Sequence, residues 1–219
     1  MNTPAPSGSG KLPVIAVLIT ALAAGIGLYA GQRWFAPPAL PQMQNSLLYP
    51  AIREIPPFTL TAEDGRAFTE ADLRGRWSLV FVGFTHCPDI CPTTLADLAK
   101  ARAQMSELPE IERPQIVFVS VDPERDSPRL TGDYAKYFDP TARGVTAEHE
   151  ALLPFTRSLG MVYMQSPLDE GGYTVDHSAS IAIIDPEGRQ VGLVRPPLDP
   201  AKIAADLRAL ADYRARTAG

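Results

Sequence analysis

The sequence predicts one α/β domain, with a central mixed sheet flanked by helices, behind a single N-terminal transmembrane helix. Three observations support this prediction. The 219 residues suffice for one domain of ordinary size and an appendage. Two nearly continuous apolar runs, at 78–84 and 116–121, have the pattern of strands buried on both faces, and a helical pattern separates them. A third apolar run, at 12–31, carries no charge over twenty residues.

The run at 12–31 is long enough to cross a bilayer, since a helix rises about 1.5 Å per residue and the hydrocarbon core is about 30 Å thick. We therefore expect a cytoplasmic tail at 1–11 and a transmembrane anchor at 12–33. Lys11 precedes the run and Trp34 follows it, which favours a cytoplasmic N-terminus. A cleaved secretory signal is the alternative, but the run exceeds the usual apolar segment of about 7–15 residues.

The residues around the anchor predict its membrane and the start of the domain. The N-terminal decapeptide lacks arginine, which argues against a mitochondrial transit peptide and favours the bacterial inner membrane, with the domain in the periplasm. A proline-rich stretch at 34–53 has no convincing periodicity and is expected to be a linker. The domain itself is expected at 54–215.

Composition excludes several classes of protein. Apolar residues make up 45% of the chain and charged residues 21%, which excludes wholesale disorder and a polytopic membrane protein. From residue 34 onward there are 18 basic and 25 acidic residues, a net charge of −7. An acidic domain is a poor general nucleic-acid binder, so nucleic acid is not an expected partner.

The first half of the domain is predicted as a β-hairpin followed by a parallel strand–helix–strand unit. Two short alternating segments flank an Asp-Gly turn at 64–65, which predicts a hairpin over 58–69. Apolar residues at helical spacing predict a helix at 93–108, between the buried strands at 78–84 and 116–121. A strand, a helix and a strand in this order imply parallel pairing.

The second half is predicted to alternate helices with strands. Helices are expected at 128–138, 147–159 and 200–214, and strands at 161–165, 178–185 and 190–195. A Pro-Glu-Gly-Arg turn at 186–189 joins the last two strands, and the apolar residues of the final helix share one face. A parallel core, a C-terminal antiparallel hairpin and a cysteine pair after the first core strand together indicate a thioredoxin-like fold.

The two cysteines of the chain, Cys87 and Cys91, lie where the first buried strand passes into a helix. Residues at i and i+4 share one face of a helical turn, so both sulfurs can converge on one point. The N-terminus of a helix lowers thiol pKa values and favours the thiolate, the form that binds metals or attacks sulfur. We therefore expect two thiolates at a partly exposed rim.

Thiolates select copper(I), zinc or iron–sulfur clusters, and imidazole also suits copper. Two sulfurs underfill a zinc site, whereas two thiolates and one imidazole suit copper in either oxidation state. His149, between two glutamates, is expected on the solvated surface, and His86 in a packing or hydrogen-bonding role. His177 precedes a predicted strand and adjoins Asp176, which could fix its tautomer. From the residues alone, a ligand role and an ordinary loop role for His177 both stay open.

Four stretches together resemble the Sco (SenC) family. They are Gly-Phe-Thr-His-Cys-Pro-Asp-Ile-Cys-Pro at 83–92, Ser-Val-Asp-Pro-Glu-Arg-Asp-Ser-Pro at 120–128, Tyr-Thr-Val-Asp-His-Ser at 173–178 and Ile-Asp-Pro-Glu-Gly-Arg at 184–189. The similarity covers about residues 54–212. Several motifs in agreement are far more specific than one cysteine pair.

The resemblance implies a membrane-anchored, thioredoxin-like copper protein, which is a metallochaperone rather than an enzyme. Such a protein helps to assemble the dinuclear copper site of cytochrome c oxidase subunit II and receives copper from an upstream periplasmic donor. The resemblance implies Cys87, Cys91 and His177 as ligands of Cu(I) or Cu(II). It implies supporting or docking roles for Asp89 and Asp122.

Other functions of the cysteine pair stay open. A thiol–disulfide oxidoreductase would use Cys87 as the attacking thiol and Cys91 as the resolving thiol, for example to reduce the copper-ligand cysteines of the oxidase subunit. Three intervening residues, rather than the usual two, favour a metal held between the sulfurs. A peroxiredoxin-like peroxidase is disfavoured, since Val80 and Phe84 stand where its pattern has proline and threonine. A plain structural disulfide would close too short a loop to stabilise the fold much.

Overall fold

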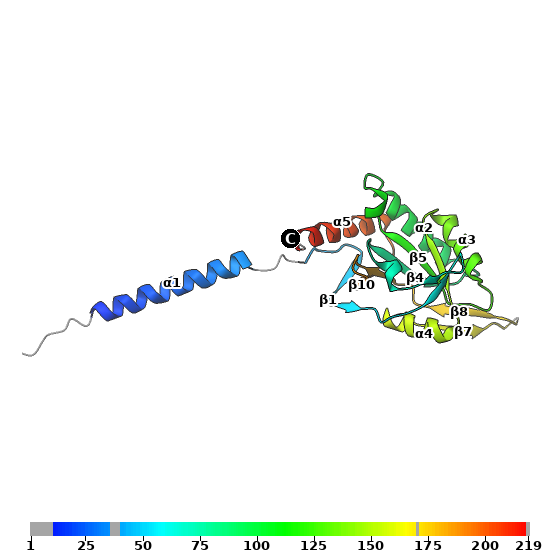
Figure 1. Ribbon diagram of the computed structural model, residues 1–219, viewed down its shortest axis with the longest axis horizontal. Coiled ribbons are helices and arrows are strands. Elements are labelled where there is room, and N and C mark those ends of the chain that lie inside the picture. The colour runs from blue at the N-terminus through cyan, green and yellow to red at the C-terminus, as the bar shows by residue number, and fades with distance from the viewer. Residues whose placement is uncertain (1–10, 36–39, 170, 218–219) are drawn as a thin grey trace, which may run out of the picture. The chain divides into compact units, whose positions relative to one another are not determined.

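The computed structural model describes residues 11–35, 40–169 and 171–217, which fall into two compact units that divide after Leu40 and after Asp212. The first unit contains helix α1, Lys11–Phe35, drawn in blue in Figure 1. Over Val14–Trp34 its mean hydropathy is 2.2, so it is long and apolar enough to cross a membrane. Its apolar side chains are exposed on all sides, as in a helix that faces lipid. Most of the expected tail, residues 1–10, lies outside the described residues.

The second unit is built on an eight-stranded mixed sheet with the strand order β1-β10-β9-β4-β5-β6-β2-β3. At its centre β4, Ser78–Gly83, pairs in parallel with β5, Gln115–Ser120, and β5 pairs in parallel with β6, Arg143–Thr146. Every residue of β4 and β5 is buried, as their continuous apolar runs predict. The parallel strand–helix–strand unit is thereby confirmed.

Both predicted hairpins are present. β9, Ile181–Ile184, pairs antiparallel with β10, Arg189–Val194, and β2, Leu60–Ala62, pairs antiparallel with β3, Ala67–Phe68. The turn glycines adopt positive φ, +81° at Gly65 and +83° at Gly188, a conformation that a residue with a side chain rarely takes. The Asp-Gly and Glu-Gly pairs therefore located these turns correctly.

Helices cover both faces of the sheet. Those of the domain are α2 Ile90–Ala103, α3 Pro128–Phe138, α4 His149–Ser158 and α5 Pro200–Thr217, with short 3₁₀ turns at Glu70–Leu73 and Glu110–Glu112. Figure 1 shows α2 and α5 above the sheet and α4 below it. The two crossovers β4–α2–β5 and β5–α3–β6 run in the same direction, so α2 and α3 share a face and contact each other.

The domain begins earlier than expected. Strand β1, Ser46–Glu54, pairs antiparallel with β10 at the edge of the sheet, and all of it except Glu54 falls in the segment that the sequence assigns to the linker. The buried carboxylate of Asp206 in α5 accepts hydrogen bonds from the backbone N–H groups of Gln44, Asn45 and Ser46. An edge strand with a bulge and mostly exposed side chains leaves no alternating pattern, so periodicity missed it.

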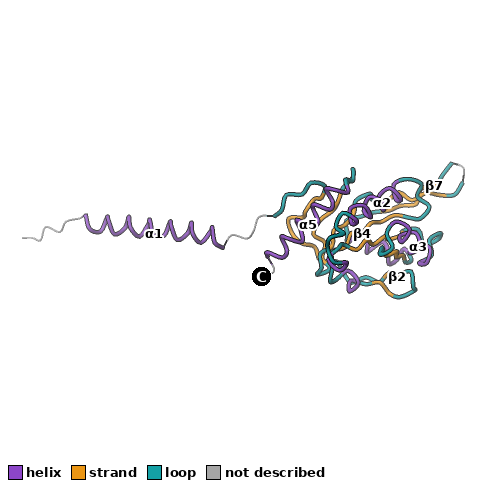
Figure 2. Tube along the Cα trace, turned by 90° about the horizontal axis from the view of Figure 1, so that it is seen from above, coloured by secondary structure: helices purple, strands orange, loops and turns teal. Residues whose placement is uncertain are grey.

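Two further differences concern the strands near the candidate site. The sequence predicts one strand at 178–185, but β9 begins only at Ile181, and residues 178–180 form no strand. A separate strand, β8, Tyr173–His177, comes before them. β8 pairs with β7, Tyr163–Pro167, in a separate two-stranded sheet. Figure 2 shows β7 reaching out from the body of the domain. Strand β6 was also missed, because it has only four residues and includes a glycine.

Candidate metal centre

The two cysteines lie at the end of β4, where the chain turns into α2. Cys87 stands three residues before the first residue of the helix, and Cys91 is in the first turn. The N–H of Cys91 donates to the Sγ of Cys87 at 3.3 Å, so the turn holds the two residues together. Both cysteines are free, Cys87 half-buried and Cys91 fully buried. Cys87 is thus the more exposed of the two cysteines.

A glycine makes room for the buried sulfur. A Cβ atom placed on Gly83, the last residue of β4, would lie 2.7 Å from the Sγ of Cys91 and 3.0 Å from the ring of Phe118. Real Cβ atoms essentially never approach other atoms that closely. The sulfur of Cys91 therefore occupies space that only glycine leaves free at this position.

His177 ends strand β8 and points its ring at the same sulfur. Its Nε2 lies 3.3 Å from the Sγ of Cys91, and its Nδ1 lies 3.2 Å from the carbonyl oxygen of Ser178. A carbonyl only accepts, so Nδ1 carries the proton and Nε2 presents its lone pair to the sulfur. The rings of Phe81 and Phe84 pack against the imidazole at centroid distances of 5.8 and 6.0 Å.

Asp176 does not fix this tautomer, contrary to the expectation. Its carboxylate is exposed and accepts a hydrogen bond from the Ser166 hydroxyl across the hairpin. Neighbouring residues of a strand point to opposite faces, so Asp176 and His177 face opposite ways. The Ser178 carbonyl takes the role that the sequence suggested for the acid.

Burial sets the protonation state of the site. It raises the pKa of the Cys91 thiol far above its usual value, and the nearby Cys87 and Asp126 raise it further. At Cys91 desolvation therefore opposes the thiolate that a helix N-terminus favours. Burial also lowers the pKa of His177, which keeps its imidazole neutral. Cys91 is then the donor, S–H to nitrogen, in its contact with His177.

One ligand atom from each of Cys87, Cys91 and His177 lies within 4.8 Å of the other two. The arrangement offers two sulfurs and one imidazole nitrogen around a common point. Soft sulfur donors with an imidazole suit copper, whereas the set has too few ligands for a closed tetrahedral zinc site. The structure thus brings together the three residues that the family resemblance implied.

The two acids of the prediction have different surroundings. Asp89 is exposed at the N-cap of α2, where its carboxylate is 3.4 Å from the Thr93 hydroxyl. Asp122 is fully buried, and it accepts hydrogen bonds from Arg125 Nε at 2.5 Å and from the Tyr173 hydroxyl at 2.7 Å. Asp122 is therefore linked to the strand that ends at His177, whereas Asp89 faces solvent.

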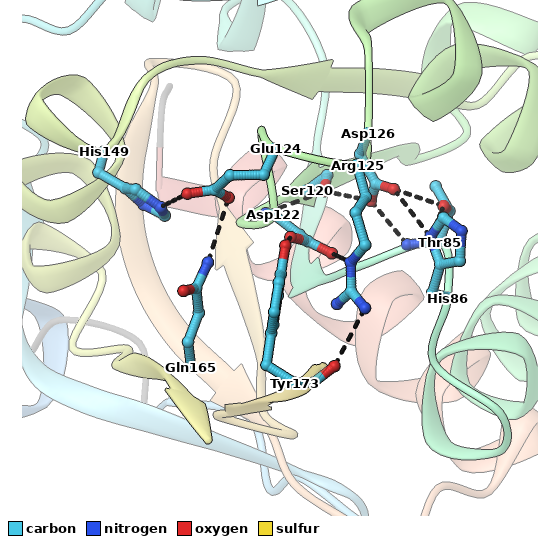
Figure 3. Close-up of polar contacts among 10 residues, drawn as sticks. All are labelled: Thr85, His86, Ser120, Asp122, Glu124, Arg125, Asp126, His149, Gln165 and Tyr173. Atoms are coloured by element: carbon cyan, nitrogen blue, oxygen red, sulfur yellow. Dashed lines mark hydrogen bonds and ion pairs between the residues drawn. The ribbon is translucent and has the colours of Figure 1, made fainter. Parts of the chain in front are cut away.

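Sequence reasoning missed Asp126. Its buried carboxylate accepts hydrogen bonds from the backbone N–H of Thr85 at 2.7 Å and from the hydroxyls of Thr85 and Ser120 at 2.5 Å each (Figure 3). The sequence could have indicated it, because Asp126 is the second aspartate of the Asp-Pro-Glu-Arg-Asp stretch, four residues after Asp122.

The other two histidines lie apart from the sulfurs. His86 is exposed, with Nδ1 3.1 Å from the Thr85 hydroxyl, in the hydrogen-bonding role that was expected. His149 is half-buried rather than solvated, and it bridges the Tyr163 hydroxyl at 2.8 Å and the Glu124 carboxylate at 3.0 Å. Because Tyr163 belongs to β7, His149 is one of the contacts that hold the hairpin against the domain.

Comparison with known proteins assigns the chain to a family. Residues 49–212 match the SCO1/SenC family model. The chain belongs to this family. A putative copper-binding protein of Stutzerimonas stutzeri is 36% identical over 160 residues, which cover 73% of this chain and 78% of that protein. The Sco resemblance drawn from four motifs is confirmed.

Solved Sco structures agree with the fold. Arabidopsis thaliana ScoI with copper bound superimposes with a TM-score of 0.67 at 35% identity, over 72% of this chain and 98% of that one. Bradyrhizobium japonicum ScoI with copper bound gives a TM-score of 0.63 at 35% identity, over 71% and 98%. The mixed-sheet, thioredoxin-like prediction is confirmed, and copper is the metal of these two Sco proteins.

Proposed function

We propose that this chain is a membrane-anchored copper metallochaperone that binds copper through Cys87, Cys91 and His177. Its proposed role is to help assemble the dinuclear copper site of cytochrome c oxidase subunit II. The observation that carries the proposal is the 3.3 Å approach of His177 Nε2 to Cys91 Sγ, with the Cys87 sulfur within 4.8 Å of both. Membership of a family of copper-binding proteins for oxidase assembly supports it.

The different accessibility of the sulfurs supports a transfer mechanism. In this mechanism Cys87, the more exposed cysteine, is the first ligand to meet an incoming donor, and the buried Cys91 and the half-buried His177 then complete the coordination. Release to a partner reverses this order by stepwise ligand exchange at the rim. With two thiolates, Cu(I) gives a complex of charge −1 and Cu(II) a neutral one. Copper is cargo here, so no bond of an organic substrate is made or broken.

Helix α1 supports attachment to a membrane, because its length and composition suit a bilayer span. We place it in a bacterial inner membrane, with the N-terminus in the cytoplasm and the domain in the periplasm. A tethered domain would meet an upstream periplasmic copper donor and a membrane-bound oxidase subunit within a confined volume.

The proposal predicts one copper ion per chain and its transfer. Full-length protein in detergent, titrated with copper, should bind one equivalent with sulfur-to-copper charge-transfer bands and a paramagnetic resonance signal from sulfur and nitrogen ligands. Mixing with the metal-free copper domain of subunit II should then move the copper to that domain. A wild-type protein that binds no copper, or that retains it in the presence of this acceptor, would contradict the proposal.

Copper binding is also expected to release protons. The pKa of Cys91 is raised, so its thiol is protonated at neutral pH and must lose that proton to bind a metal. Affinity should therefore rise with pH between 6 and 8, with at least one proton released per copper. Calorimetry in two buffers of different ionisation enthalpy measures this number directly. Equal heats in both buffers would show that Cys91 is already a thiolate.

Thiol–disulfide exchange is the second candidate function. The half-buried Cys87, four residues before the fully buried Cys91, suits an attacking and a resolving thiol. In this reaction the Cys87 thiolate would attack a disulfide of subunit II, and Cys91 would then displace the mixed disulfide, which leaves the partner reduced and this chain oxidised. Turnover with a peptide that contains the subunit II cysteines tests it, and no turnover by the wild type would eliminate it.

A further inference from the structure

We infer that the loop 122–126, between β5 and α3, is a two-sided clamp that sets the distance between the cysteine segment and the histidine strand. Asp126 positions the cysteine segment, and Arg125 with Asp122 positions the strand that ends at His177. The inference rests on the proposed function for its purpose, whereas its contacts are all made by residues of this chain. Thr85 belongs to the cysteine segment and Tyr173 to the histidine strand. Figure 3 shows Asp126 near Thr85, and Asp122 with Arg125 near Tyr173.

On the cysteine side, one carboxylate holds the chain just before Cys87. Asp126 accepts hydrogen bonds from the N–H and the hydroxyl of Thr85, and from the hydroxyl of Ser120 at the end of β5. The Asp126 side chain is completely buried, where an anion is tolerated only because several donors satisfy it. Thr85 therefore cannot move relative to β5 without leaving a buried charge unpaired.

On the histidine side, Arg125 connects the loop to β8. Its Nε donates to Asp122, its Nη1 donates to the Tyr173 carbonyl at 3.0 Å, and its guanidinium lies 3.9 Å from the centroid of the Tyr173 ring. The Tyr173 hydroxyl donates a hydrogen bond to Asp122 at 2.7 Å. Arg125 also lies 5.6 Å from the ring of Phe84, which packs against His177. The first residue of β8 is thus fixed at its backbone, its ring and its hydroxyl.

The hairpin needs such side-chain contacts. In the sheets of the described residues, β7 and β8 pair only with each other, so no ladder ties them to the eight-stranded sheet. Glu124 adds a contact on the outer side, since it accepts from Gln165 of β7 at 3.1 Å and pairs with His149 (Figure 3). This loop therefore adds to the packing of β8 against β4 and to its short connection to β9 in fixing His177 relative to Cys91.

The same residues could be mistaken for a second metal site. Ligand atoms of His86, Asp122 and Asp126 lie within 4.8 Å of one another. However, each of the four carboxylate oxygens already accepts a hydrogen bond, from Arg125, Tyr173, Thr85 or Ser120. These donors already satisfy the two buried carboxylates without a metal ion. The cluster is a scaffold, and one copper per chain is expected.

The test compares Asp126→Asn and Arg125→Gln in full-length protein in detergent, first without metal. Asp126→Asn should speed alkylation of the buried Cys91 about tenfold or more, because local opening of the segment becomes easier. Arg125→Gln should leave that rate unchanged. The imidazole nitrogen resonances of His177 should then show a mixture of tautomers, whereas the wild type should show the Nδ1–H tautomer alone. These readouts separate the two sides of the clamp.

With copper, the same variants should give different spectra. Arg125→Gln should weaken the imidazole nitrogen coupling of bound Cu(II), and Asp126→Asn should shift the sulfur-to-copper charge-transfer band. Loss of an outer partner typically costs about 10- to 100-fold in metal affinity, and we expect that range for both variants. If Asp126→Asn does not fold, Thr85→Val removes only the hydroxyl contact and should give a smaller change of the same kind.

Asp139→Asn is the matched control. Asp139 is also a buried carboxylate that accepts the N–H and hydroxyl of a threonine, Thr141, at 2.8 and 2.6 Å, but it lies at the far end of α3 from the loop. It should lower stability without moving any of these signals. Wild-type signals in Asp126→Asn and Arg125→Gln, or a second copper held by His86, would overturn the clamp. Shifted metal-free signals in a chain that binds no copper would support the clamp and contradict only the proposed function.

Discussion

Replacing His177 with alanine is expected to abolish tight Cu(II) binding while thiol titration stays intact. The substitution removes the imidazole whose Nε2 lies 3.3 Å from Cys91 Sγ, and it leaves the cysteine turn and its N–H to Sγ contact in place. Loss of a direct ligand should cost at least the 100-fold that losing an outer partner can cost, so we expect a decrease of about 100-fold or more. Cu(I) binding should suffer less, because two thiolates suffice for linear coordination.

The measurement is a copper titration followed by absorption and paramagnetic resonance, with free thiols counted in parallel. His86→Ala is the control, because His86 is next to Cys87 in sequence but exposed, with its Nδ1 3.1 Å from the Thr85 hydroxyl and 3.4 Å from Asp126 Oδ1. It should keep copper stoichiometry and nitrogen coupling, and any loss of affinity should be far smaller than that of His177→Ala. The same three quantities unchanged in His177→Ala would refute the ligand role of this residue. Disulfide turnover that persists in His177→Ala would favour the oxidoreductase alternative.

Gly83→Ala is expected to weaken both the fold and copper binding. The new Cβ would lie 2.7 Å from the Cys91 sulfur and 3.0 Å from the Phe118 ring, and both groups are fully buried. Overpacking of a core typically costs about 1–3 kcal/mol, which denaturant unfolding can measure. Because the sulfur must move to relieve the contact, its distance from His177 must change, and copper affinity should fall with stability.

Gly132→Ala separates these two effects. A Cβ at Gly132 in α3 would lie 2.2 Å from the Cβ of Glu63, so this variant is also overpacked, but at a place where no sulfur is involved. It should lose stability and keep the copper spectrum. If Gly83→Ala binds copper with wild-type affinity and spectrum, the glycine serves packing alone, and the steric link between β4 and the sulfur is wrong.

Much of the fold could be predicted because its signals are local. The buried runs of β4 and β5 and the turn glycines each depend on residues within a few positions of one another. β1 and β6 gave no such signal, since one is a mostly exposed edge strand and the other has four residues. The β7–β8 hairpin was not predicted, because only three residues separate the end of β8 from the start of β9.

The candidate site divides in the same way. Cysteines four residues apart before a helix predict two converging sulfurs from sequence spacing alone. Asp89 and Asp122 could not be distinguished by sequence, and folding exposes the first and buries the second. Asp126 was overlooked because its partner Thr85 is 41 residues away in the chain.

The sequence by itself determined the buried strands β4 and β5, the helices, the cysteine turn and the family, since each is written in short-range patterns. Only the tertiary structure decided that His177 meets Cys91 across 86 residues, which of its nitrogens faces the sulfur, and that burial raises the pKa of Cys91. Those properties depend on burial and on contacts between distant segments. Neither exists until the chain has folded.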